Sequence, residues 1–315
     1  MTVSIIITCK GFSANLEECI QKCKALDYPD YEIIVLPDEN FNIQETDIKI
    51  IATGNVLPAK KRDLALAHAK GEVLAFLDDD AYPDKNWLKN AARHFENADI
   101  AAVGGPAVTP DSDSMMKKAS GLIYASSLVS ANYAYRYKPG IRVFVDDYPS
   151  CNFIVRKGIF QEIGGFDTAF WPGEDTILCL KIKEMRKKIL YDPEVLVFHH
   201  RRPLYSEHLR QVSNYALHRG YFVKRFPGNS LKFTYFVPTI FILGLILAPV
   251  LSVFSPFVNN LYLGAWAFYL FLVFIFSLNK DLRLIPLVFS GIILTHIAYG
   301  VNFLKGLVSK KLKEE

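Results

Sequence analysis

The stretch VLAFLDDDAYPDKNW, residues 73–87, places three aspartates directly after a run of five apolar residues. An apolar run that stops so abruptly predicts a buried β-strand. Asp78, Asp79 and Asp80 would then stand at the carboxyl end of that strand. Like charges this close repel one another unless a cation or hydrogen-bond donors compensate them. The stretch therefore predicts a strand that ends in a charged site. The alternative is an acidic turn before the next helix.

The residues upstream predict the rest of an α/β fold. VSIIIT (3–8) and YEIIVL (31–36) are continuous apolar runs, and LEECIQKCKAL (16–26) repeats apolar residues at helical spacing. KKRDLALAHAK (60–70) predicts a second amphipathic helix that ends at Gly71. Strand, helix and strand in this order form a βαβ unit with parallel strands. The aspartates are therefore expected where open α/β sheets bind their ligands, beyond the carboxyl ends of the strands.

The last quarter of the chain has a different composition. Three runs, 233–254, 261–278 and 284–304, contain no aspartate, glutamate, lysine or arginine. Each has roughly the 18–20 apolar residues that cross about 30 Å of hydrocarbon as a helix. The alternative, buried helices of a soluble core, would leave these helices nothing polar to expose to water. We expect an all-α domain with two to three transmembrane helices.

These patterns divide the chain into four parts. Residues 1–203 form the α/β domain, 204–232 an amphipathic juxtamembrane segment, 233–304 the membrane domain and 305–315 a basic tail. The N-terminal apolar run is too short to span a membrane and has no basic leader, which predicts that there is no signal peptide. We therefore expect an integral protein of the plasma membrane whose first domain lies in the cytoplasm. Three crossings would place the lysine-rich tail outside, against the positive-inside rule. One run is therefore a candidate for re-entry, first of all the proline-containing 233–254.

Charge and cysteine content exclude other classes. The net charge of +4 is mild and dispersed, which fits anionic substrates or lipid headgroups and not a nucleic-acid platform. The five cysteines form an odd set without metal-ligand spacing, and we expect all of them to be reduced. Two further segments, 115–144 and 204–228, mix tyrosines with basic ends, which is typical of helices at a bilayer interface. A solvent-exposed helix pair is the alternative for the first of them.

Motifs in residues 2–202 resemble, in order, those of the family-2 inverting glycosyltransferases of the GT-A fold. VSIIITCKG is similar to the opening strand, YEIIVLPDEN to the second strand with its nucleotide-binding aspartate, and the stretch ending in AFLDDD to the metal-binding Asp-x-Asp. CNFIVRKGIFQEIGGFDTAFWPGEDTILCLKI resembles the acceptor half. The resemblance implies a Rossmann-like, mostly parallel sheet flanked by helices. It also implies sugar transfer from a nucleotide diphosphate sugar, with inversion.

The same resemblance implies a donor and metal site. Asp80 would bind Mg²⁺ or Mn²⁺, and Asp78, on the same face of the strand, would contact the ribose or the metal. Oxygen ligands suit these hard cations. His199 resembles a histidine that some members use as a further ligand, with His200 as the alternative. The implied donor-binding residues are Thr8, Asp38, Arg62, Asp78 and Asp79. A solvated helix charge is the alternative for Arg62. The sequence departs from the family where Asp38 lies between Pro37 and Glu39, and where Asp63 follows Arg62.

An acid pair is implied for the acceptor side. Asp175 matches the family's general base and Glu174 its neighbour, at the start of a predicted helix whose dipole stabilises carboxylates; helix capping alone is the alternative. An acceptor hydroxyl needs a base, whereas a polyprenyl phosphate is already an anion. A lipid-linked saccharide is therefore the favoured acceptor, in cell-envelope glycan or polysaccharide assembly. The candidate acceptor-binding residues are Trp171, Arg201 and Arg202.

Three other functions remain open from the sequence. One is a polyprenyl-phosphate glycosyltransferase. Another is a processive polysaccharide synthase, although three spans make a poor channel and the Gln-x-x-Arg-Trp motif is missing. The third is a catalytically silent membrane protein that keeps the fold as a binding module, although the carboxylates are all present.

Overall fold

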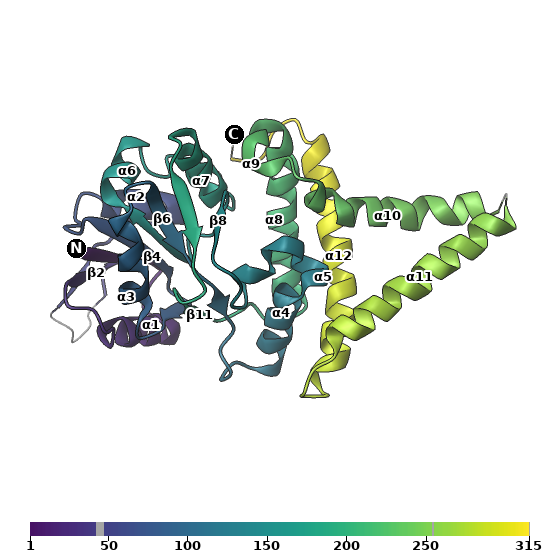
Figure 1. Cartoon of the computed structure of the whole chain (residues 1–315), viewed down its shortest axis with the longest axis horizontal. Helices are drawn as coiled ribbons and strands as arrows, with labels where there is room; N and C mark the ends of the chain where they lie inside the picture. Colours follow the sequence, from purple (N-terminus) through teal and green to yellow (C-terminus); the bar gives the residue numbers. More distant parts are fainter. Residues whose placement is uncertain (42–46, 254, 315) are drawn as a thin grey trace. The chain divides into compact units, whose positions relative to one another are not determined.

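A computed structural model describes residues 1–41, 47–253 and 255–314, which form two compact units (Figure 1). The first unit consists of Met1–Pro110 and Tyr135–His200, and the second of Asp111–Ala134 and Arg201–Lys313. Residues 111–134, which the sequence places inside the 1–203 domain, thus make their contacts with the later helices. Residues 254 and 315, the last positions of the first apolar run and of the basic tail, lie outside the described residues.

The first unit is built around an eight-stranded sheet of order β3-β2-β1-β4-β9-β6-β10-β8. At its centre β1 (Val3–Thr8) lies parallel to both β2 (Tyr31–Leu36) and β4 (Val73–Asp78). β1 is buried throughout, and so are the last four residues of β2 and the first five of β4, as expected for strands covered on both faces. The predicted, mostly parallel α/β sheet is confirmed. The other strands are β3 (Ile48–Ile50), β6 (Ile100–Gly104), β8 (Val143–Val145), β9 (Asn152–Arg156) and β10 (Lys188–Tyr191).

Helices cover both faces of this sheet because alternate side chains of each strand point to opposite faces. On one face α1 (Ala14–Lys24) and α3 (Trp87–Ala92), which continues into η1 (Arg93–Glu96), pack on Ile5 and Ile7. On the other face α2, α6 and α7 pack around Ile6 and Phe76. The bounds of these three helices are Pro58–Ala65, Lys157–Glu162 and Glu174–Glu184.

Helix α2 is shorter than its sequence pattern predicts. It ends at Ala65, whereas the apolar spacing predicts a helix over 60–70. The chain has to pass close to β1 at Gly71, where a Cβ atom would approach the Ser4 nitrogen to 2.4 Å. The Gly71 N–H also donates to Ser4 Oγ at 2.8 Å. The predicted helix is therefore wrong beyond residue 65, because this approach requires an extended entry into β4.

A second, three-stranded sheet of order β5-β11-β7 brings the end of the first unit back to the aspartates. Strand β11 (Val197–His199) runs antiparallel to β5 (Ala81–Pro83), with His199 opposite Ala81. It also runs parallel to β7 (Ala107–Val108). His199 therefore lies beside Ala81, the residue that follows Asp80.

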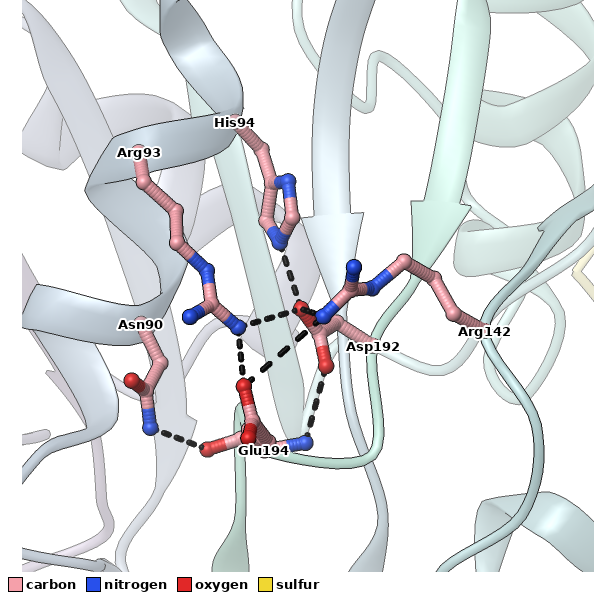
Figure 2. A network of polar contacts seen from close by, with 6 residues as sticks. All are labelled: Asn90, Arg93, His94, Arg142, Asp192 and Glu194. Atoms are coloured by element: carbon pink, nitrogen blue, oxygen red, sulfur yellow. Dashed lines mark hydrogen bonds and ion pairs between the residues drawn. The ribbon is translucent and has the colours of Figure 1, made fainter.

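A buried carboxylate fixes the turn that leads into β11 (Figure 2). The Asp192 side chain is fully buried and lies 3.0 Å from both Arg93 and Arg142. It also accepts from the Glu194 N–H at 2.9 Å and contacts His94. Burial by itself would raise the pKa of Asp192, but these hydrogen bonds and charges outweigh it and lower the pKa. Asp192 thus joins η1, the segment before β8 and the β10–β11 turn.

The second unit is helical. Helix α8 lies beside α12 in this unit, and α10 and α11 extend away from α12 and converge at their far ends (Figure 1). Three of its helices, α10, α11 and α12, are long and apolar enough to cross a membrane. The bounds are α4 (Met115–Ala125), α5 (Ser127–Ser130), α8 (Ser206–Arg225), α9 (Pro227–Ser230), α10 (Phe233–Ser252), α11 (Pro256–Ser277) and α12 (Leu284–Val308); η2 (Ala131–Arg136) leads back to the first unit.

Replacing Asp192 tests the network of Figure 2. We expect Asp192→Asn to lower the free energy of unfolding of the first unit by about 2 kcal/mol, because charge-assisted hydrogen bonds are lost. Because the folded-state pKa is lowered, this difference should be present at neutral pH and vanish as the pH falls through the folded-state pKa. Denaturant unfolding of the purified protein measures it. The control is Asp99→Asn, whose ion pair with Lys188 is exposed; a loss as large there would contradict the prediction.

Candidate active site

The strand ends bring one cluster of possible metal ligands together. Thr8 is the register partner of Asp78 on β1 and β4, so the two residues end neighbouring strands. Two residues further on, Asp80 is buried, and its Oδ1 lies 3.0 Å from His199 Nε2. Asp78, Asp80 and His199 each offer one ligand atom, and these atoms lie within 4.8 Å of one another. Two carboxylates and an imidazole form a donor set that suits Mn²⁺ or Mg²⁺.

Among the described residues, the cluster of possible ligands includes neither Asp79 nor His200. Burial, followed by the charge of Asp79, raises the pKa of Cys9 to about 12. His200 lies 3.0 Å from Glu18 and not in the cluster. Of the two histidines, the structure thus brings His199 to the aspartates. All five cysteines are buried, and none is in a disulfide.

Arg62 joins this cluster to the acid pair of α7. Its guanidinium is 2% exposed and donates to Asp78 Oδ1 at 2.7 Å and to Glu174 Oε1 at 3.3 Å. It also lies over the Phe166 ring, 5.5 Å from the centroid. A solvated helix charge, the alternative for Arg62, does not fit this burial.

Glu174 and Asp175 open α7 directly after Gly173, whose φ of 122° favours glycine. Burial raises the pKa of Asp175 to about 6, against the charge of Arg62 and hydrogen bonds from Ser150. Burial and the neighbouring Asp175 charge raise the pKa of Glu174 as well. Asp175 Oδ1 is buried and has no hydrogen-bond partner among the described residues. This acid is therefore suited to accept a proton near neutral pH.

A second buried cation, which the sequence analysis missed, holds Asp38. Lys61 is 3% exposed, and its ammonium donates to Asp38 Oδ1 and to the carbonyls of Cys9 and Leu36. An ammonium has three N–H donors, and these contacts use all of them. Lys61 thereby ties Asp38 to the carboxyl ends of β1 and β2. Lys61 is three residues after Pro58 and four before Ala65, so all three lie on one face of the helix. This spacing was the signal in the sequence that Lys61 is buried.

Asp63 has a structural role that accounts for its departure from the family pattern. Its carboxylate accepts from the N–H groups of Phe166 and Asp167 at 2.8 and 3.1 Å. This fixes α2 to the loop that precedes α7. The charged run Lys61-Arg62-Asp63 therefore contacts three different segments of the first unit.

The candidate acceptor residues are distributed between the units. Trp171 lies two residues before Gly173 and is 49% exposed. Arg201 and Arg202 belong to the second unit, where Arg201 lies over the Tyr124 ring, 5.9 Å from its centroid. Arg202 is exposed. Their role in acceptor binding remains a prediction.

A mostly parallel sheet with aspartates and a histidine at its strand ends, and an acid pair opening a helix beside them, defines the class of GT-A glycosyltransferases. The family described as Glycosyl transferase family 2 matches residues 4–164. This match covers half of the chain, and the chain belongs to that family.

Similar proteins have transferase names. A pre-mycofactocin glycosyltransferase of Mycobacterium tuberculosis is 25% identical over 211 residues, which cover 64% of this chain and 43% of that protein. The O-antigen chain rhamnosyltransferase RfbN of Salmonella typhimurium is 28% identical over 162 residues, 50% of this chain and 48% of that protein. The chain thus spans less than half the length of these curated relatives.

A solved structure shares the fold over almost the whole chain. It is the mannosyltransferase PcManGT from Pyrobaculum calidifontis in complex with GDP-Man and Mn²⁺. The TM-score is 0.64 at 17% identity, and the match covers 98% of this chain and 88% of the mannosyltransferase. At this identity the likeness establishes the fold.

Removing the buried ammonium of Lys61 should destabilise the first unit. Lys61→Met leaves Asp38 and two strand-end carbonyls without their donor, and we expect a loss of about 3 kcal/mol in the free energy of unfolding. Lys60→Met is the matched control, because the neighbouring lysine is exposed and its loss should change stability by less than about 0.5 kcal/mol. Equal effects of the two substitutions in denaturant titrations would refute the role given to Lys61.

Proposed function

We propose that this protein is a membrane-bound, metal-dependent inverting glycosyltransferase. It moves one sugar from a nucleotide diphosphate sugar to a hydroxyl of a lipid-linked saccharide, in cell-envelope glycan or polysaccharide assembly. One observation carries the proposal: Arg62 contacts both Asp78 of the metal-ligand cluster and Glu174 of the acid pair. A donor diphosphate and an acceptor hydroxyl bound at this edge of the sheet would therefore lie within reach of each other.

On the donor side, Asp78, Asp80 and His199 would hold Mn²⁺ or Mg²⁺. Such an ion supplies Lewis-acid stabilisation to the departing nucleoside diphosphate. Asp38, positioned by Lys61, would accept a hydrogen bond from the nucleobase of the donor. Thr8 and Asp79 would line the same pocket. The GDP-Man and Mn²⁺ in the mannosyltransferase of the same fold, and the rhamnosyltransferase among the relatives, agree with a nucleotide-sugar donor.

On the acceptor side, Asp175 would take the proton of the attacking hydroxyl. Its pKa of about 6 makes it more basic than an ordinary aspartate and, being below 7, still leaves most of it ionised at neutral pH. Arg62 holds Glu174 in place beside it, so that Glu174 orients the acceptor or its loop. Attack from the face opposite the leaving diphosphate inverts the configuration at the sugar carbon. A phosphate acceptor would make this base unnecessary.

The apolar helices support a place in the membrane. Residues 233–279 contain no charged side chain, and most of the large apolar side chains on α10 and α11 are exposed. We place the protein in the plasma membrane with its catalytic unit in the cytoplasm, where nucleotide sugars and lipid-linked acceptors meet.

The base and the metal ligands have separate tests. With a panel of sugar nucleotides, a membrane-lipid extract and Mn²⁺ or Mg²⁺, we expect Asp175→Asn to lower kcat for nucleoside diphosphate release by about 10²–10⁴-fold. Asp80→Ala should abolish the metal-dependent part of that release. Glu162→Gln, an exposed carboxylate on α6, is the control and should retain full activity.

The outcomes separate the alternatives. Full activity of Asp175→Asn would indicate a polyprenyl phosphate acceptor. A ladder of long products would indicate a processive synthase. No release with any donor in the presence of lipid would leave a catalytically silent binding module.

The pH profile provides an independent test. Asp175 acts as a base only when ionised, and its pKa is raised from 3.8 to about 6. We therefore expect kcat/KM to fall tenfold per pH unit below about pH 6. An acid limb near pH 4 would show that the base has an ordinary carboxyl pKa and would contradict the assignment to Asp175.

A further inference from the structure

The three apolar helices of the second unit differ in how much of each is covered. Within the most apolar window of each helix, 39% of α12 is buried, against 17% of α10 and 11% of α11. The neighbours of α12 include α4, α8, α10 and α11. The longest of the three helices is thus the one with the least surface available to lipid.

Helix α8 covers α12 over most of its length, and the two helices run in the same direction. Glycines permit the close approach: a Cβ on Gly220 would meet the Phe303 carbonyl at 2.1 Å, and one on Gly306 the Leu217 carbonyl at 1.9 Å. Three hydrogen bonds follow the pairing in chain order: Tyr205 with Ser290 (2.9 Å), His208 with Thr295 (2.9 Å) and Lys224 with the Ser309 carbonyl (2.6 Å).

The outer face of α8 is too polar for a bilayer interior. Its exposed residues are Ser206, Glu207, Arg210, Asn214, Tyr215, Lys224 and Arg225. By the pairing above, Arg210 lies beside the middle of α12. If α12 crossed the bilayer, α8 would be carried through the hydrocarbon with it and Arg210 would lie near the midplane, where a charge is costly. The α8–α12 pair therefore fits the headgroup surface.

Helices α10 and α11 have the opposite character. Helix α10 contacts α12 through its first half, where Pro238, Thr239 and Ile242 lie against Gly300. Beyond this contact it extends away from α12, crosswise to it, and α11 returns (Figure 1). Two helices that cross in this way do not both stand upright in one bilayer. With 20 and 22 residues, α10 and α11 are each about 30 Å long, enough to span the hydrocarbon.

The basic residues agree with a hairpin of two membrane helices. The turn between α10 and α11 and both helices carry no charge. Lysines and arginines lie on the chain before α10, between α11 and α12, and in the tail: Lys224, Arg225, Lys232, Lys280, Arg283, Lys305, Lys310, Lys311 and Lys313. Only a topology in which these three segments share one side satisfies the positive-inside rule for all of them.

We infer that α10 and α11 alone enter the bilayer as a hairpin, while α12 lies with α8 at the headgroup surface. The C-terminal tail then stays on the same side as the first unit, and anionic headgroups contact the basic residues of α8 and of the tail. The inference rests on the membrane location in the proposed function. It removes the conflict between three apolar runs and a lysine-rich tail.

Cysteine labelling tests this topology in the full-length protein. Because the native cysteines are all buried, the wild type gives the background for a membrane-impermeant maleimide. Glu162→Cys marks the first unit, Ser255→Cys the hairpin turn and Lys313→Cys the tail. In inverted vesicles from the expression host we expect the first and the last to react and Ser255→Cys to remain unlabelled. In right-side-out vesicles, Glu162→Cys and Lys313→Cys should both be protected.

Three results would overturn the inference. Labelling of Lys313→Cys only in right-side-out vesicles would show that α12 crosses the bilayer. Labelling of Ser255→Cys in inverted vesicles as fast as Glu162→Cys would show that the hairpin does not enter it. Release of the protein from the membrane by carbonate washing would show that it is not an integral membrane protein. Nucleoside diphosphate release, measured on the same vesicles, reports the transferase activity separately from all three.

Discussion

The buried guanidinium of Arg62 is the interaction on which the candidate site depends. A charge at 2% exposure is costly unless it is paired, and Arg62 is paired with Asp78 from a strand end and Glu174 from a helix start. It therefore compensates one of the three adjacent aspartates at the strand end, Asp78. Asp80 lies against His199. The same pairing holds the start of α7 beside the strand ends.

Helix α2 supplies the connections around this pair, although it has only eight residues. Lys61 fastens Asp38 to two strands, and Asp63 holds the loop before α7 through two backbone N–H groups. Gly71 then brings the chain onto β1 and into β4. A short helix whose consecutive charged side chains reach three segments fixes Asp38, the end of β4 and the start of α7 relative to one another.

In the second unit, helices of similar apolar composition differ in how much of their surface is covered by other helices. Residues 284–304 are as free of charge as 233–254. Helix α12, however, packs along α8, which has an exposed polar face, whereas α10 and α11 expose most of their apolar side chains. The cost of burying a charge in hydrocarbon depends on what accompanies a helix as well as on its own residues.

The sequence by itself determined the parallel sheet, the position of the aspartates at a strand end, the acid pair at the start of α7 and the three apolar helices. Periodicity, strand-end position and motif order are local signals, and they carry this information without tertiary contacts. Only the tertiary structure decided that Lys61 is buried against Asp38, that Arg62 bridges Asp78 and Glu174, that His199 and not His200 faces Asp80, and that α8 covers α12. Each of these is a pairing between segments far apart in the chain, and a side chain with several possible partners is assigned one only when folding brings the segments together.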